Sequence, residues 1–280
     1  MRKHLYIQTI AITFIFFALM FVGGCYQDVI DVDFSEIVNQ VVIEGMITNE
    51  LTNHTVKISM TSSYSDPYDY PAVTGAEVTV SDNEGNVIIF EESESGIYKS
   101  PMMQGVPGRT YTLNVVYDND TFTAVSYMPQ PLKLDSSRFV PSDDYGNYNF
   151  KYCFSDDEEV TEQCRFEVYM NDYYLRDESF LYNGKYYEGK STAKDDIYGS
   201  SLYSDVIHID IYSMDETGFN IYSNMRERDE SVIEEDEINV GAFFNVTDFN
   251  ISNISSGAIG FFSAESVTKY DIIYSVSNNR

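Results

Sequence analysis

The sequence has 280 residues, and its 45 acidic and 17 basic side chains give a formal net charge of −28. A surface this acidic repels phosphate backbones and argues against a nucleic-acid partner. The contents of 43% hydrophobic and 15% aromatic residues argue against a disordered chain. The aromatic residues are 24 Tyr and 18 Phe, which favour strands, so the composition predicts a folded, acidic and β-rich protein.

Residues 1–24 are predicted to be a lipoprotein signal peptide. Arg2 and Lys3 precede a mostly apolar stretch that ends in Val22-Gly23-Gly24-Cys25. Small residues before a cysteine match the bacterial lipobox, in which the thiol takes a diacylglyceryl group and becomes the mature N-terminus. We therefore expect cleavage before Cys25 and attachment to the membrane through lipid on Cys25. An uncleaved anchor helix is the alternative, since roughly 17–25 apolar residues span a bilayer. Both interpretations place the bulk of the chain outside the cytoplasm.

Residues 25–39 are predicted to be an acidic tether, and residues 40–128 to be an antiparallel β-sandwich domain. Apolar and polar side chains alternate with period two in the second segment, which indicates strands that bury one face. About seven short strands in about 90 residues is typical of an immunoglobulin-like or transthyretin-like sandwich. The side chains expected to be buried are Val56, Ile58, Val78, Val80, Tyr111, Leu113 and Val115.

Residues 129–280 are predicted to form a second β-rich domain with one helix. Strands are expected at 148–154, 164–170, 206–212, 258–264 and 267–274. A helix is expected at about 213–228, where Ser213 and Glu216 fit a capping box and the apolar spacing is helical. Gly218 weakens the helical pattern. The fold class predicted for the whole chain is thus mainly β.

The chain resembles the Bacteroidota lipoproteins classed as "domain of unknown function 4249". The resemblance is carried by Cys25 with its acidic segment and by five stretches that occur in order along nearly all of the mature chain. These stretches are 42–48 (VIEGMIT), 71–80 (PAVTGAEVTV), 105–113 (GVPGRTYTL), 211–214 (IYSM) and 253–262 (NISSGAIGFF). The family supplies no catalytic or ligand residues. Cysteines at positions 153 and 164 depart from its pattern.

The resemblance implies a function in nutrient uptake, because members of the family are often neighbours of TonB-dependent outer-membrane receptors. It also implies an outer-membrane location, with the acidic segment after Cys25 resembling a signal for export to the cell surface; the periplasmic face is the alternative. We expect a non-enzymatic binding or accessory subunit of such a receptor. An adhesin or structural surface protein is the second hypothesis, and a carboxylate-based hydrolase the third.

The sequence gives little support to catalysis, to a metal site or to a cofactor. Two histidines remain in the mature chain, and both His54 and His208 are predicted to be surface residues. The segment 82–86 lacks the glycine and the glutamate of an EF-hand and is better explained as a hairpin turn. Acidic runs at 156–159 and 234–237 leave weak calcium binding open. The tyrosine-rich stretch 145–203 is either a platform for sugars or proteins, or a set of sheet-covering side chains.

Cys153 and Cys164 are predicted to form a disulfide. An exported chain meets oxidising conditions, and these two cysteines are the ones left after lipidation of Cys25. They lie at facing ends of two strands that are expected to form a hairpin. Alternation places the two side chains on opposite faces, so the bridge requires a bulge or an irregular strand end.

Overall fold

The computed structural model describes residues 40–61, 70–141, 147–154, 163–171, 173–174, 180–183, 192–200, 206–229 and 252–273. In the first half the strands are β1 (Val41–Thr48), β2 (Thr55–Met60), β3 (Glu77–Asp82), β4 (Val87–Glu94), β5 (Ile97–Lys99), β6 (Thr110–Tyr117) and β7 (Asp120–Tyr127). They are followed by β8 (Ser136–Pro141), β9 (Asn147–Phe154), β10 (Gln163–Met170), β11 (Tyr173–Tyr174), β12 (Phe180–Asn183), β13 (Thr192–Ser200), β14 (Val206–Ser213), the helix α2 (Glu216–Asp229) and β15 (Ile259–Ile273). The prediction of a mainly β chain with one helix is confirmed for the described residues.

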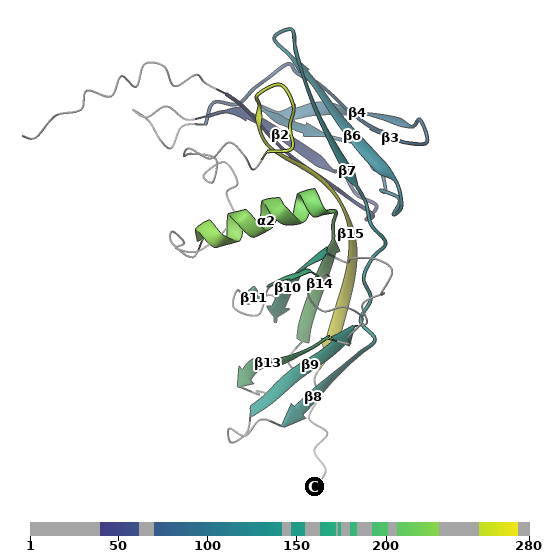
Figure 1. The fold of residues 1–280 in the computed structure, drawn as a ribbon, viewed down its shortest axis with the longest axis vertical. Helices are drawn as coiled ribbons and strands as arrows, with labels where there is room; N and C mark the ends of the chain where they lie inside the picture. Colours follow the sequence, from purple (N-terminus) through teal and green to yellow (C-terminus); the bar gives the residue numbers. More distant parts are fainter. Residues whose placement is uncertain are drawn as a thin grey trace, which may run out of the picture. The chain divides into compact units, whose positions relative to one another are not determined.

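Twelve strands form one large mixed sheet. Its order is β11, β10, β14, β15, β1, β2, β5, β4, β3, β6 and β7, with β12 added beside β10. The strand β15 links the two halves of this sheet: its first half pairs parallel with β1, and its second half pairs antiparallel with β14 (Figure 1). Strands from both halves of the sequence are therefore continuous in one hydrogen-bonded sheet.

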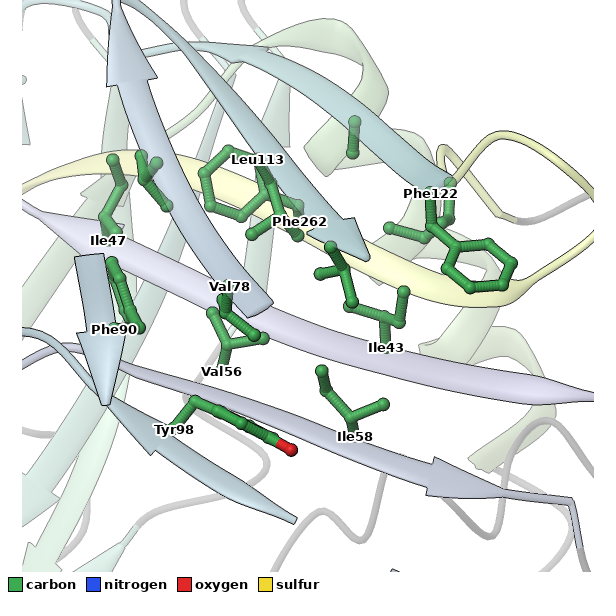
Figure 2. Close-up of a cluster of buried hydrophobic side chains, with 14 of the residues drawn as sticks. Ile43, Ile47, Val56, Ile58, Val78, Phe90, Tyr98, Leu113, Phe122 and Phe262 are labelled. Carbon is green, nitrogen blue, oxygen red and sulfur yellow. The ribbon is translucent and has the colours of Figure 1, made fainter. Parts of the chain in front are cut away.

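The main hydrophobic core lies among β1–β7 and the first half of β15. All seven side chains predicted to be buried are at most 2% exposed, so the predicted strand register is confirmed. Figure 2 shows Ile43, Ile58, Leu113 and Phe262 among the side chains of this core. Phe262 comes from β15, more than 200 positions from Ile43 in the sequence. The last described strand is therefore needed to complete a core that begins with the first.

Leu113→Ala should destabilise the protein by about 2–5 kcal/mol, because it removes buried methyl groups and leaves a cavity. Leu113 is 1% exposed, and Leu51→Ala is a matched control because Leu51 is 63% exposed. Urea unfolding of both variants would measure the difference. A loss of stability in Leu51→Ala as large as in Leu113→Ala would contradict this assignment of the core.

The strand β15 is one continuous element where the sequence pattern predicted two. Its pairing changes between Glu265, opposite Thr48, and Ser266, opposite Ser213. Asn49 supports this point: its side chain accepts a hydrogen bond from the backbone N–H of Val267 at 2.6 Å and donates one to the Val267 carbonyl at 3.3 Å. The side-chain amide of Asn49 thus takes the place of the next backbone partner of β15, so β15 continues where its partner strand changes.

The helix begins three residues later than predicted, and its cap is a different residue. Asp215 is the N-cap, because its Oδ1 accepts a hydrogen bond from the Gly218 N–H at 2.8 Å. The predicted capping box of Ser213 and Glu216 is wrong: Ser213 ends β14, and its hydroxyl accepts a bond from the Leu132 N–H. A Cβ on Gly218 would lie 3.0 Å from the hydroxyl oxygen of Ser263. The glycine that weakens the helical pattern is therefore what lets α2 approach β15 closely.

The predicted hairpin that carries Cys153 and Cys164 is also wrong. Cys153 lies on β9, which pairs with β8 and β13 in a separate three-stranded sheet. Cys164 lies on β10 in the large sheet, where its Sγ is 3.4 Å from the hydroxyl oxygen of Ser213. The side chain of Cys153 is outside what the structure describes, so the disulfide stays a prediction.

Candidate functional site

One side of the strands β10, β14 and β15 carries charged and aromatic side chains, which we call the charged face. Alternation along each strand places these residues opposite the apolar cluster of Phe166, Val168, Ile209 and Ile211. The charged face comprises Arg165, Glu167 and Tyr169 on β10, His208, Asp210 and Tyr212 on β14, and Val267, Lys269 and Asp271 on β15. Pairing across the strands arranges them in three rows, which become progressively more exposed with distance from α2.

The row nearest α2 holds the buried guanidinium of Arg165. Its Nη2 is 3.3 Å from Oε2 of Glu265, a carboxylate with no exposed surface, and its Nη1 forms an ion pair with Glu167. The guanidinium also lies over two rings, 4.0 Å from the centroid of Tyr212 and 4.6 Å from that of Tyr222 on α2. Burial raises the pKa values of both tyrosines, so their hydroxyls stay protonated. This arrangement offsets the desolvation of Arg165 with two carboxylates and two aromatic faces.

The middle row is a set of carboxylates around one lysine. Glu167 pairs across the strands with Asp210, and Asp210 with Lys269. The ammonium of Lys269 is 3.6 Å from Asp210 and 3.1 Å from Glu50. Desolvation raises the pKa of Asp210, with the charge of Lys269 opposing it. In Lys269 desolvation acts to lower the pKa, but the hydrogen bond to Glu50 and the charge of Asp210 outweigh it and raise the pKa.

The row farthest from α2 is aromatic and more exposed. Tyr174 on β11, Tyr169 and His208 lie side by side across three strands, followed by Asp271 on β15. The rings of Tyr169 and Tyr174 are tilted by 54° with their centroids 5.3 Å apart, and Tyr174 is 49% exposed. Tyr169 donates a hydrogen bond to Oε2 of Glu167 at 2.9 Å, and His208 Nδ1 lies 2.7 Å from Asp271. Of the tyrosine-rich stretch 145–203, Tyr169 and Tyr174 thus form a ring pair on this face, and the platform hypothesis stays a prediction.

A second surface, which we call the uncharged face, lies on the far side of β3, β4, β6 and β7 from the core. Its eight residues form two rows across the four strands: Val87, Ser81, Thr112 and Val125 in one, and Ile89, Thr79, Asn114 and Thr123 in the other. None of them is charged, although 22% of the chain is charged. Val87, Ile89 and Val125 are 65%, 64% and 55% exposed. Exposed aliphatic groups without charges among them are typical of protein contact surfaces.

The edge strand of the uncharged face is β7. At several positions its backbone groups already form hydrogen bonds within this chain, so another chain cannot pair with them there. The hydroxyl of Ser255 accepts a hydrogen bond from the Thr123 N–H, and the Ser255 N–H donates to the Thr123 carbonyl. The carboxylate of Asp215, the N-cap of α2, accepts from the Tyr127 N–H at 2.8 Å. These contacts protect an edge that would otherwise invite strand addition, so a partner would meet the face of the sheet.

The stretches that carry the family resemblance have structural functions in this chain. In 105–113 the Tyr111 hydroxyl accepts a hydrogen bond from the Val106 N–H, and a Cβ on Gly105 would lie 2.7 Å from the Thr48 carbonyl oxygen. In 253–262 the side chain of Asn253 bonds both the N–H and the carbonyl of Phe262. Three residues of the two surfaces lie in these stretches: Thr79 and Thr112 on the uncharged face, and Tyr212 on the charged face.

The remaining predicted residues have mixed outcomes. Cys25 and the acidic runs at 156–159 and 234–237 lie outside the described residues. The hairpin turn at 82–86 is confirmed: the Asp82 carboxylate accepts bonds from the N–H groups of Glu84 and Asn86. His54 is 5% exposed, so its surface placement was wrong. It is enclosed because its backbone N–H donates to the Ser100 hydroxyl and its ring Nδ1 accepts, at 3.4 Å, from the Thr48 N–H.

Within the described ranges, no three His, Cys, Asp or Glu side chains are grouped as a metal site would require. No helix in those ranges combines the length and apolar character needed to cross a membrane.

Comparison with known proteins gives a family match and distant structural likenesses. No curated protein matches the sequence. The structure of the adhesin InvE from Yersinia pseudotuberculosis is similar over 63% of this chain and 58% of that one, less than two thirds of its length, with 12% identity and a TM-score of 0.22. A TM-score this low supports no inference about fold or function. The family described as "Domain of unknown function (DUF4249)" matches residues 27–271. The chain therefore belongs to the DUF4249 family.

Proposed function

We propose that this protein is a lipid-anchored lipoprotein of the outer membrane, exposed at the cell surface, and a non-enzymatic accessory subunit of a TonB-dependent transporter. Lipid on Cys25 would hold it to the membrane, and the uncharged face would dock on the transporter. The proposal rests on the lipobox at 22–25 and on the resemblance to lipoproteins that are often neighbours of TonB-dependent receptors.

The observation that carries the proposal is the composition of the uncharged face. A chain with a net charge of −28 keeps eight adjacent positions of one sheet surface free of charge. Charged residues are depleted at the centre of protein interfaces, because burying them costs desolvation energy. Three aliphatic side chains more than half exposed at this place are consistent with a surface that a partner covers.

Affinity purification of the full-length lipoprotein from native membranes tests the proposal. We expect a β-barrel receptor to be recovered with the wild-type protein and to be lost with Ile89→Asp, which puts a charge on the uncharged face at an exposed position of β4. Leu51→Asp is the matched control, since Leu51 is equally exposed but lies elsewhere, and it should retain the receptor. Absence of any β-barrel protein from the wild-type preparation would contradict the proposal.

Cys25→Ala should release the protein from the membrane fraction or mislocalise it, because the thiol is the proposed site of lipid attachment. Stable anchoring requires more than one acyl chain, and the variant can carry none at this position. Fractionation followed by mass spectrometry of the mature N-terminus would measure both effects. An unmodified Cys25, or a retained segment 1–24, would show that the anchor is assigned incorrectly.

We also propose the finer division of the fold, with residues 40–128 as a sandwich and residues 129–280 as a second β-rich domain. Supporting this division, the apolar cluster among β1–β7 and β15 is distinct from the cluster that contains Phe166 and Ile209. The boundary near Pro129 would follow β7 directly.

A further inference from the structure

The uncharged face carries its side chains in an order that is nearly the same from either side. Its strands lie in the order β4, β3, β6 and β7. The outer strands bring aliphatic groups, from Val87 and Ile89 on β4 and from Val125 on β7, which also carries Thr123. The inner strands bring hydroxyl and amide groups, from Thr79, Ser81, Thr112 and Asn114. A second copy turned about a two-fold axis would therefore place aliphatic groups over aliphatic groups and hydroxyl groups over hydroxyl groups.

The positions that border this face are also suited to a second copy. By alternation, Glu77 on β3 and Glu91 on β4 point to the same side of the sheet as the face. Val116 on β6 pairs with Glu77 and with Thr121 on β7, so the other half of this border is uncharged. A two-fold axis parallel to the strands lays β3 and β4 of one copy over β6 and β7 of the other. The two glutamates then lie over uncharged residues, and like charges do not meet.

The net charge of the chain favours this face for self-association. Two copies with a formal net charge of −28 each repel one another over most of their surfaces. Contact through the eight residues of the uncharged face buries no charged group and therefore avoids the cost of desolvating one. The edge of β7 is already bonded to Ser255 and Asp215 of its own chain, so two copies would pack face to face.

The extent of the face determines how strongly two copies can associate. It continues without charge along β6 and β7, through Thr110 and Tyr127 at one end and Val116 and Thr121 at the other, and all of these residues are at least partly exposed. Strands about 4.8 Å apart and a repeat of about 6.8 Å along one face give these twelve positions an area of about 400 Å² per copy. Specific complexes bury about 800 Å² per partner, so we expect a weak, reversible dimer, favoured on a membrane where copies share one plane.

We propose that two copies of this protein associate through the uncharged face, in a weak two-fold dimer that covers the face while no transporter is bound. The second copy and the transporter would then compete for the same residues, so release of the dimer would regulate docking. The inference rests on the proposed function for this competition, but not for the dimer itself, which the purified protein would form without a transporter.

Sedimentation of the purified full-length lipoprotein in detergent, from about 10 μM to about 1 mM, tests the inference. We expect a reversible dimer in the wild type. Ile89→Asp and Val125→Asp, on the two outer strands, should each weaken it about tenfold or more, because two-fold symmetry brings the added carboxylate into the contact twice. Leu51→Asp is the matched control, since Leu51 is 63% and Ile89 64% exposed, and it should stay within about twofold of the wild type.

The effect of salt distinguishes this dimer from one held by charge pairs. Raising the salt concentration from about 0.1 M to about 1 M shortens the Debye length from about 10 Å to about 3 Å and screens the repulsion between two acidic copies. The dimer should therefore tighten by about threefold or more, whereas a dimer held by ion pairs would weaken.

Any of three results would overturn the inference. One is a monomer at every protein concentration and at both salt concentrations. Another is a dimer that either Ile89→Asp or Val125→Asp weakens no more than Leu51→Asp does, and the third is a dimer that weakens as salt is added. Recovery of a β-barrel receptor from native membranes is measured separately, so a monomeric protein that recovers the receptor would overturn the dimer alone. A dimer that recovers no receptor would overturn the transporter proposal alone.

Discussion

Glu265→Ala should lower the free energy of unfolding by about 3–5 kcal/mol, the cost of leaving one member of a buried ion pair without its partner. Glu265 has no exposed surface, and the guanidinium that it contacts lies between the rings of Tyr212 and Tyr222 beneath α2. Without this carboxylate, Glu167 is the one carboxylate left in contact with Arg165, and the positive charge beneath α2 is less well balanced. Urea unfolding would measure the loss.

The matched control is Glu50→Ala, which also removes a carboxylate from an ion pair. Glu50 and its partner Lys269 are 43% and 49% exposed, so we expect a change of about 0–1 kcal/mol. The double variant Glu265→Leu with Arg165→Met removes both charges of the fully buried contact and should recover part of the stability; Glu167, whose side chain is 15% exposed, then loses its partner. Equal effects of Glu265→Ala and Glu50→Ala, or no recovery in the double variant, would contradict this account of the network.

Gly260→Ala should cost about 3–5 kcal/mol, from backbone strain and overpacking acting together. Gly260 has a φ of +119°, which L side chains rarely adopt. It lies opposite Ile43 in the parallel ladder of β1 and β15, and an added Cβ would be 1.9 Å from the Ile43 carbonyl oxygen. The methyl group therefore cannot fit unless the two strands separate.

Gly257→Ala separates the two causes. Gly257 has a φ of +76° but nothing within 4 Å of an added Cβ, so its substitution carries the backbone strain without the clash. We expect it to cost about 1–2 kcal/mol. Thermal or urea unfolding of both variants gives the comparison, and a Gly260→Ala protein as stable as Gly257→Ala would show that β1 and β15 do not approach as closely as described.

Alternation of apolar residues was sufficient to predict the core but not the path of the last strand. Leu113 and Val115 are buried as predicted, because a register of period two follows directly from strand geometry. The pattern breaks at Glu265 and Ser266, where polar side chains interrupt the apolar run, and two strands were therefore predicted. Both residues are fully buried, since α2 and the neighbouring strands cover them. Nothing in the local sequence indicates that other elements bury these two residues.

The charged face could be predicted only in part. The alternation of Arg165, Glu167 and Tyr169 along one strand is visible in the sequence. Their neighbours are not, because the order of β10, β14 and β15 depends on pairing between residues as many as 67 positions apart. The expected hairpin partner of β10 belongs to another sheet. The uncharged face was missed for a similar reason, since polar Thr and Ser alternating with core residues form a surface only once four strands are aligned.

The most direct test of the proposed function is site-specific photocrosslinking in native membranes. A photoreactive residue at position 89, an exposed position of the uncharged face on β4, should form an adduct with a β-barrel outer-membrane protein. The same residue at position 51, which is equally exposed but lies outside that face, should not form it. A β-barrel adduct at position 89 alone is the result that we predict. No such adduct at position 89, or equal adducts at both positions, would contradict docking through the uncharged face.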